Sequence, residues 1–301
     1  MCERWKQTDS YKNPLTIEEN VKMLEDAKNA GMLFYAVEGG EPLLHHQLPQ
    51  ILQQAKKLDF STTIITNGYL LKKRSDEIAP FADSIIVSID SNDDLHDEMR
   101  GLKGLRHQAI EGIKQYKNSK TKITLNSVLC TLNSEKIDGL LMLSEDLRVP
   151  IIFQPMDIYK GYNEHLRLTP QTLQKIFLKI YNRKKEVYKI GNSYSYLQHI
   201  INNTRYVCHA PKCFTYVKPD GNIVSCCDIS EKVWGNVKEK RFKDIFGSKE
   251  YKAFCRTMEP CNQCSVYAVV DTSLLYSLHP RYLIENFASA DSFIANMKKN
   301  T

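Results

Sequence analysis

Short apolar runs alternate with amphipathic stretches along the first half of this chain, and this alternation limits the possible folds more than any other feature. Runs rich in β-branched residues predict strands, and apolar residues that recur every three or four positions predict helices. The expected strands cover residues 33–38, 61–66, 84–90, 122–129 and 151–154. Strands and helices in regular alternation are typical of parallel sheets, so we predict an α/β fold.

The first helix is expected to begin after Thr16. Threonine is a good helix cap, and Glu18 and Glu19 place negative charge in the first turn, where the helix dipole favours it. Apolar residues then follow at helical spacing. The sequence therefore predicts a helix directly before the first strand of the sheet.

The 301 residues are enough for one barrel-sized domain and a smaller appendage. The net charge of +6 is modest and is spread over helix faces without interleaved aromatic residues, so we expect no nucleic-acid partner. No run approaches the roughly 18 apolar residues of a membrane helix, and no signal peptide is visible. We therefore expect a cytoplasmic protein with no membrane partner.

Polar residues follow three of the predicted strands, at the ends where a parallel barrel collects its functional groups. The first strand runs into Gly39, Gly40, Glu41 and Pro42. Two glycines let the backbone approach a ligand closely, Glu41 offers a carboxylate, and Pro42 stops the strand. Such a strand end can hold the ammonium group of an amino acid. The next two strands end in further polar residues: Thr66 and Asn67, then Ser88 and Asp90.

The nine cysteines indicate metal binding. The cytoplasm keeps thiols reduced, so clustered cysteines there favour a metal over disulfides. Seven of the nine lie between Cys208 and Cys264, whereas Cys130 on an apolar strand is expected to be an ordinary buried residue. Cys261 and Cys264 have the two-residue spacing with which two thiolates hold one metal or cluster.

A β-hairpin is predicted inside the cysteine-rich region. Residues 214–217 and 222–224 are β-prone, and the turn between them contains Gly221 where a positive φ is wanted. The hairpin would bring one of two upstream cysteines close to Cys226, either Cys208 or Cys213.

The Gly-Gly-Glu-Pro and Ser-x-Asp strand ends, together with Met1-Cys2, resemble the radical S-adenosylmethionine (SAM) enzymes. In that family a Cys-x3-Cys-x2-Cys motif holds three irons of a [4Fe-4S] cluster, and Met1-Cys2 looks like its end. The resemblance implies this cluster and S-adenosyl-L-methionine as cofactors, in a partial (βα)6 TIM-like barrel. It implies the following SAM-binding residues: Gly39, Gly40, Glu41, Pro42, Thr66, Asn67, Ser88, Asp90 and Arg100. The implied ligand of the SAM-binding cluster is Cys2.

Residues 96–101 match a His-Asp-x-x-Arg-Gly stretch that is common in the branch of this family with auxiliary clusters. The resemblance implies that Arg100 holds the methionine carboxylate through its planar guanidinium. The alternative is an ion pair at a helix end, in which Asp97 or Asp94 is the partner of Arg100.

The tail resembles the shortened form of the SPASM domain, called a twitch domain, which binds one auxiliary [4Fe-4S] cluster. The resemblance rests on Cys-x12-Gly-x4-Cys, then Gly-Asn at 235–236, then a helix and a Cys-x2-Cys pair. It implies four ligands: Cys208, Cys226, Cys261 and Cys264. Three further cysteines can replace one of these: Cys213, Cys227 and Cys255. Four thiolates also suit tetrahedral zinc, so a zinc ribbon stays open.

The resemblance divides the chain into three parts. A barrel covers residues 1–205, a SPASM/twitch-like iron-sulfur domain covers 206–265, and C-terminal helices cover 266–301. We interpret the barrel as lacking its first strand and two cluster cysteines, through loss of upstream residues. Because Cys2 alone cannot hold a [4Fe-4S] cluster, we expect the isolated chain to be inactive.

The implied function is the generation of a 5′-deoxyadenosyl radical that modifies a peptide or small-molecule substrate, with a reducing electron donor as a second partner. Two other functions remain open on the sequence. One is a non-catalytic zinc- or iron-sulfur-binding protein derived from this fold. The other is a scaffold module that binds a peptide through its C-terminal domain.

Overall fold

The structure, a computed structural model, describes residues 12–158, 162–186, 189–225, 232–261 and 264–277. Its main sheet consists of five parallel strands, which are β1 (Phe34–Val37), β2 (Ser61–Thr66), β3 (Ser84–Ser88), β4 (Lys122–Leu129) and β5 (Ile151–Pro155). They lie in the sheet in the same order as along the chain. The predicted α/β fold with five parallel strands is confirmed, although β3 ends at Ser88, before Asp90.

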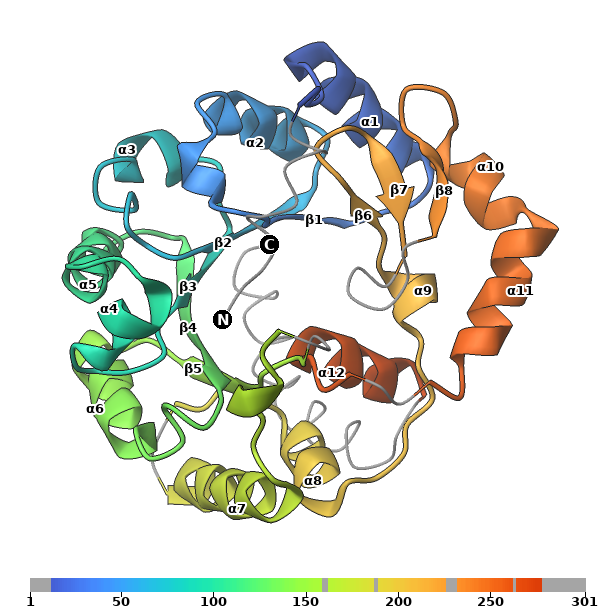
Figure 1. Ribbon diagram of the computed structural model, residues 1–301. Coiled ribbons are helices and arrows are strands. Elements are labelled where there is room, and N and C mark those ends of the chain that lie inside the picture. Colours follow the sequence, from blue (N-terminus) through green and yellow to red (C-terminus); the bar gives the residue numbers. More distant parts are fainter. Residues whose placement is uncertain (1–11, 159–161, 187–188, 226–231, 262–263, 278–301) are drawn as a thin grey trace, which may run out of the picture.

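Helices cover one face of this sheet, which curves into part of a barrel (Figure 1). The helices between and before the strands are α1 (Ile17–Asn29), α2 (Leu48–Lys57), α3 (Ser75–Ile78), α4 (Leu95–Arg100), α5 (Leu105–Gln115) and α6 (Ile137–Leu147), with a short 3-10 helix η3 (Pro42–Leu44). After β5 come η4 (Glu164–Leu166), α7 (Pro170–Glu186) and α8 (Tyr194–Asn202).

α1 begins as predicted. The Thr16 hydroxyl oxygen accepts a hydrogen bond from the Glu19 backbone N–H at 3.2 Å, and a Glu19 carboxylate oxygen accepts from the Thr16 N–H at 2.9 Å. This reciprocal capping box satisfies two N–H groups that the first helical turn leaves unpaired. A cap of this kind contributes about 1 kcal/mol to helix stability.

The two faces of the sheet differ in burial, because burial alternates along β3 and β4. Residues such as Ile85, Val87 and Leu125 are completely buried and form the core beneath the helices. Successive side chains point to opposite faces, so the residues between them line the inner, concave face. Ser88 and Asn126 are register partners on that inner face. The inner face is therefore partly polar towards the carboxyl ends of the strands.

The cysteine-rich region contains a small antiparallel sheet of β6 (Tyr216–Val217), β7 (Asn222–Val224) and β8 (Val233–Asn236). The predicted turn is confirmed, because Gly221 has a φ of 89° and a Cβ there would lie 2.7 Å from the Asn236 side chain. β6 is shorter than the predicted strand 214–217, because Phe214 caps α9 (Ala210–Cys213) and its N–H donates to the Ala210 carbonyl oxygen at 2.8 Å. β8 was not predicted, because it is a strand only through its pairing with β7.

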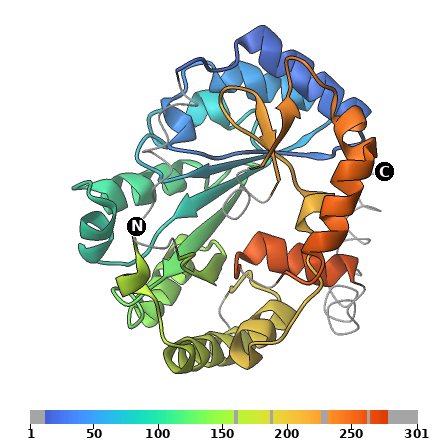
Figure 2. The same cartoon turned by 45° about the vertical axis from the view of Figure 1, so that its right-hand side comes forward.

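The C-terminal elements close a ring with the barrel, as the two views show (Figures 1 and 2). α10 (Phe242–Gly247) and α11 (Lys249–Met258) follow β8, and side chains from this region share an apolar core with α1. The Asp26 carboxylate on α1 accepts the Phe242 N–H at 2.7 Å. α12 (Tyr267–Tyr276) packs against α8, and the Tyr267 N–H donates to the Gln154 side chain at 3.0 Å.

α12 lies in the region 266–301 for which C-terminal helices are expected, and residues 278–301 of that region lie outside the described residues. Within the described ranges, none of the helices has both the length and the apolar character needed to cross a membrane.

Candidate functional site

Glu41 joins the ends of β1 and β2. Its Oε1 accepts from the Thr66 hydroxyl at 2.6 Å and from the Leu43 N–H at 3.0 Å, while its Oε2 accepts from the Asn67 N–H at 2.8 Å. Thr66 is buried and Glu41 is half-buried. A carboxylate has about four acceptor positions, so three bonds leave roughly one for a ligand. Residues predicted from two separate strand ends thus meet at one fixed carboxylate.

The two glycines before Glu41 turn the chain out of the sheet. Gly39 has a φ of 137°, a backbone conformation that residues with a Cβ rarely adopt. Pro42 then occupies the first position of η3, where its missing N–H costs nothing, and Glu41 caps the same short helix. Gly40 is exposed. The Gly-Gly-Glu-Pro sequence therefore has a local structural reason, which is to hold Glu41 at the edge of the sheet.

Arg100, at the end of α4, pairs with Asp90. Its Nε and Nη2 lie 2.8 and 2.7 Å from the same Asp90 oxygen, Oδ2. The Asp90 side chain is fully buried, and the Arg100 side chain is 22% exposed. The alternative partners Asp94 and Asp97 were therefore wrong, because the arginine folds back onto the end of β3. Asp97 instead accepts backbone N–H groups at the start of α5.

Two buried side chains hold the backbone of Asp90. His96 Nδ1 accepts the Asp90 N–H at 3.1 Å, and Asn133 Nδ2 donates to the carbonyl oxygens of Asp90 and Val128, both at 3.0 Å. Burial lowers the pKa of His96 to about 4, so the ring is neutral near pH 7. Its buried Nε2 has no hydrogen-bond partner in the described structure. The sequence placed His96 in a motif without assigning it a role, and Asn133 belongs to none of the motifs.

Asn126 is a candidate residue that the sequence reasoning missed. It lies beside Ser88 on the inner face, and its Oδ1 is buried without a hydrogen-bond partner among the residues that the structure describes. Alternation along residues 122–129 indicates which residues share a face, but only the register with β3 shows that this face is the inner one. An unpaired buried amide oxygen of this kind suits a polar ligand.

Three of the four predicted auxiliary-cluster ligands lie around Tyr206. The Tyr206 hydroxyl oxygen is 3.5 Å from Cys264 Sγ. Burial raises the pKa of Tyr206, and the neighbouring thiols of Cys264, Cys208 and Cys261 raise that pKa further. Thiols from two sequence-distant segments are thus brought together at the base of the tail. Cys2 and Cys226 lie outside the described residues.

The donor chemistry of this cysteine group fits an iron-sulfur cluster, although within the described ranges no three His, Cys, Asp or Glu side chains are arranged to hold a metal ion. Burial raises the pKa of the Cys208 and Cys264 thiols. The thiolate form therefore needs a nearby positive charge, which iron supplies.

The remaining described cysteines lie in different surroundings. Cys130 is completely buried, as expected, and Cys255 belongs to the core shared with α1. Cys213 is half-buried at the end of α9, and Cys227 lies outside the described residues. A role for these cysteines as replacement ligands stays a prediction.

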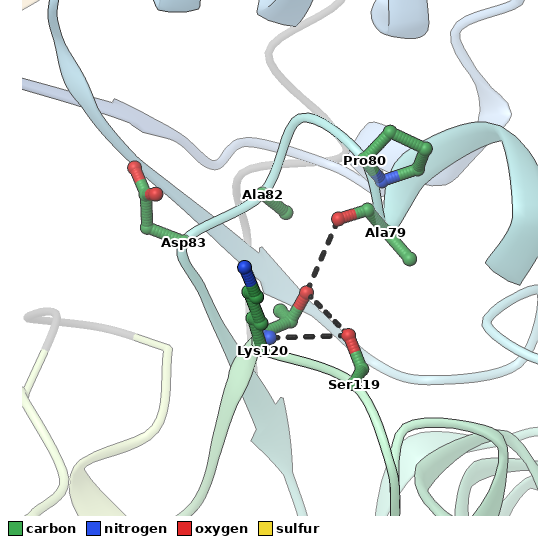
Figure 3. A pocket seen from close by; sticks show the side chains of 7 residues that line it. Ala79, Pro80, Ala82, Asp83, Ser119 and Lys120 are labelled. Carbon is green, nitrogen blue, oxygen red and sulfur yellow. Dashed lines mark hydrogen bonds between the residues drawn. The ribbon is translucent and has the colours of Figure 1, made fainter.

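One pocket lies at the opposite end of the sheet, where β3 and β4 begin (Figure 3). Its volume is about 410 Å³. Thr121 in its wall donates to the Ala79 carbonyl oxygen at 3.3 Å. Because parallel barrels carry their functional residues at the carboxyl ends of the strands, this pocket lies away from the candidate site.

A curved parallel sheet with charged strand ends, joined to a cysteine-rich tail, is the architecture of an iron-sulfur barrel protein. Residues 1–143 match the Radical SAM superfamily model, and residues 208–265 match the SPASM model of an iron-sulfur cluster-binding domain. The chain therefore carries a radical SAM domain and a SPASM domain. The first domain implies a [4Fe-4S] cluster and SAM, and the second implies auxiliary iron-sulfur clusters. The SPASM match favours iron-sulfur over zinc in the tail.

Solved structures share this fold. Streptococcus suis SuiB bound to the precursor peptide SuiA superposes with a TM-score of 0.66 at 19% identity, covering 86% of this chain and 64% of SuiB. The structure of anSMEcpe with bound AdoMet and the Kp18Cys peptide has a TM-score of 0.63 at 15% identity, covering 93% of this chain and 90% of anSMEcpe.

A curated relative is the Fe-coproporphyrin III synthase of Methanosarcina barkeri (strain Fusaro / DSM 804). It is 26% identical to this chain over 153 residues, which is 50% of this chain and 38% of the synthase. The chain therefore spans less than two thirds of the length of both SuiB and the synthase.

Proposed function

We propose that this protein uses a SAM-binding [4Fe-4S] cluster to generate a 5′-deoxyadenosyl radical and to modify a peptide or small-molecule substrate. The observation that carries the proposal is a pair of fixed charges at the carboxyl edge of one sheet. The Glu41 carboxylate is held at the ends of β1 and β2, and the Arg100 guanidinium is held at the end of β3. Reductive cleavage of SAM to methionine and the radical is the chemistry that the bound cluster supplies.

The two charges suit the two ends of an amino acid. The remaining acceptor position of Glu41 would take a hydrogen bond from the methionine ammonium group. In the described structure Arg100 Nη1 has no hydrogen-bond partner, so it would donate to the methionine carboxylate. Asp90 and Thr66 are buried and would act by positioning these two residues.

Polar groups on the inner face suit the rest of the cofactor. Ser88 and Asn126 lie side by side there, and the Asn126 carbonyl oxygen is unpaired among the described residues. We expect them to bind hydroxyl groups of the adenosine. The helices outside the sheet and the tail would shield the substrate from water.

We assign the cluster ligands from the cysteine spacing and from the grouping of three thiols around Tyr206. Cys208, Cys261 and Cys264 would hold the auxiliary cluster with Cys226 as the fourth ligand, and Cys2 would be one ligand of the SAM-binding cluster. A [4Fe-4S] cluster that binds SAM needs three thiolates, so Cys2 must act with further thiolates.

The peptide class of substrate is supported by two structural relatives. SuiB and anSMEcpe were both solved with bound peptides, and they cover 86% and 93% of this chain. A small-molecule substrate is supported by the name of the synthase, which covers half of the chain. We favour a peptide because the peptide-bound relatives include the tail as well as the barrel.

The test is anaerobic reconstitution with iron and sulfide, carried out on two forms of the protein. One is the 301-residue chain, and the other carries added residues that complete Cys-x3-Cys-x2-Cys at Cys2. We expect about four irons in the first and about eight in the second, with 5′-deoxyadenosine released by the second after reduction with SAM. A Cys261→Ala variant should lose the tail iron in both. Zinc without iron, or iron without SAM cleavage, would favour the non-catalytic alternative.

A further inference from the structure

We propose that Tyr206 donates a hydrogen bond to the sulfur of Cys264 and thereby raises the reduction potential of the auxiliary cluster. The inference rests on the proposed function in one respect, because it requires Cys264 to be a ligand of the auxiliary cluster. It assigns a role to a residue that no motif in the sequence contains.

Packing fixes the position of the Tyr206 ring. The side chain is 8% exposed, and its ring meets the His199 ring edge-on, with the centroids 5.2 Å apart. The hydroxyl oxygen lies 3.5 Å from Cys264 Sγ. A ring that is buried and held on one side has little freedom to point its hydroxyl elsewhere.

Of the two acceptors that Cys264 offers to this hydroxyl, the sulfur is the better one. The Cys264 carbonyl oxygen is also 3.5 Å from the hydroxyl, which is long for an O–H···O bond, whose usual length is about 2.7–2.8 Å. The same distance is ordinary for sulfur, because sulfur is the larger atom. A thiolate bound to iron has no proton to donate, so the phenol must be the donor.

A hydrogen bond to a ligand sulfur changes the balance between the two oxidation states. Reduction adds an electron and makes the cluster and its sulfurs more negative, so a donor stabilises the reduced state more than the oxidised one. Loss of the donor would therefore lower the potential.

Tyr196 provides a matched control. It is completely buried, and its hydroxyl donates to the carbonyl oxygen of Ser265 at 2.7 Å. Ser265 is the residue directly after Cys264. Tyr196→Phe loosens the same loop without removing a bond to sulfur. Tyr206→Phe removes the bond to sulfur and keeps the ring against His199.

The experiment is a redox titration of the reconstituted 301-residue chain, in which electron paramagnetic resonance monitors the reduced cluster. We expect Tyr206→Phe to lower the equilibrium constant for one-electron reduction about tenfold, which is about 59 mV. Tyr196→Phe should leave it within about twofold. Equal shifts in the two variants, or no shift in Tyr206→Phe, would overturn the inference.

A second measurement uses the unmodified chain and so does not depend on the folding of a variant. In D2O, electron-nuclear double resonance should detect an exchangeable deuteron coupled to the auxiliary cluster, and its absence would also overturn the inference. Iron content distinguishes an error in the proposed ligand set from an error in the role of Tyr206. If Cys264→Ala retains full tail iron, the proposed ligand set is wrong, whereas lost iron with an unmoved Tyr206→Phe potential refutes only the role of Tyr206.

Discussion

Asp90 accepts the Arg100 guanidinium on one carboxylate oxygen and the Val128 N–H on the other, at 2.7 and 3.0 Å. The end of β3, the end of α4 and the end of β4 therefore meet at one buried carboxylate. This arrangement makes Arg100 a fixed cation at the edge of the sheet.

Asp90→Asn tests this ion pair. Asparagine keeps an oxygen for the Val128 N–H but removes the negative charge beside Arg100. We expect the free energy of unfolding to fall by about 3 kcal/mol, because a partly buried guanidinium loses its partner. Urea denaturation measures the change. Asp94 is exposed at the start of α4, and Asp94→Asn should change the free energy of unfolding by less than about 0.5 kcal/mol. Equal effects would show that the ion pair between Asp90 and Arg100 contributes no more to stability than an exposed charge does.

His96 should make stability depend on pH. Its pKa is about 4 in the folded protein and 6.5 without burial, so the unfolded chain takes up the proton first as pH falls. Its contribution is fully present above about pH 6.5 and is lost as the pH falls towards 4, with about 2 kcal/mol lost between pH 7 and pH 5.

The check is the free energy of unfolding at both pH values for the unmodified chain and for His96→Asn. Asparagine can accept from the Asp90 N–H without titrating, so the variant should lose less stability at pH 5. The exposed His107 is the control, and His107→Asn should keep the unmodified pH dependence. A pH dependence that survives in His96→Asn would contradict the prediction.

Gly68 is expected to tolerate no side chain. Its φ is 84°, and a Cβ would lie 2.7 Å from the Ala109 Cβ and 2.9 Å from Val87 Cγ1. We expect Gly68→Ala to cost about 2–4 kcal/mol in the free energy of unfolding. Gly104 has nearly the same φ, 80°, but open space around it. Gly104→Ala should therefore cost only about 1 kcal/mol, and the difference between the two variants isolates the effect of the close contact.

Glu41→Gln tests SAM binding. Glutamine keeps one acceptor oxygen but cannot pair with an ammonium charge, so we expect the dissociation constant for SAM to rise about tenfold or more. Equilibrium dialysis measures this constant on the reconstituted form that completes Cys-x3-Cys-x2-Cys at Cys2. Thr66→Val removes the donor that orients Glu41 and should also weaken binding. In a double-variant cycle the two effects should be less than additive, since both act through one carboxylate. Full additivity would mean that Thr66 acts independently of Glu41.

The candidate site was predictable where its signals are local. The strand ends, the Gly-Gly turn and the two-cysteine spacing are each contained within a few residues. The contact between Glu41 and Asn67 was not predicted, because it depends on β1 and β2 being neighbours in the sheet. Asp90 was not predicted as the partner of Arg100, because the ion-pair alternative considered only Asp94 and Asp97, which are close to Arg100 in the chain.

The sequence by itself determined the capping of α1, the five parallel strands and the turn at Gly221, because these depend on residues close together in the chain. The tertiary structure decided which face of β4 carries Asn126 and which carboxylate binds Arg100. It also placed Tyr206 beside Cys264, a residue 58 positions away. Contacts of this kind depend on how separate elements pack, and the periodicity and spacing of one segment do not specify that packing.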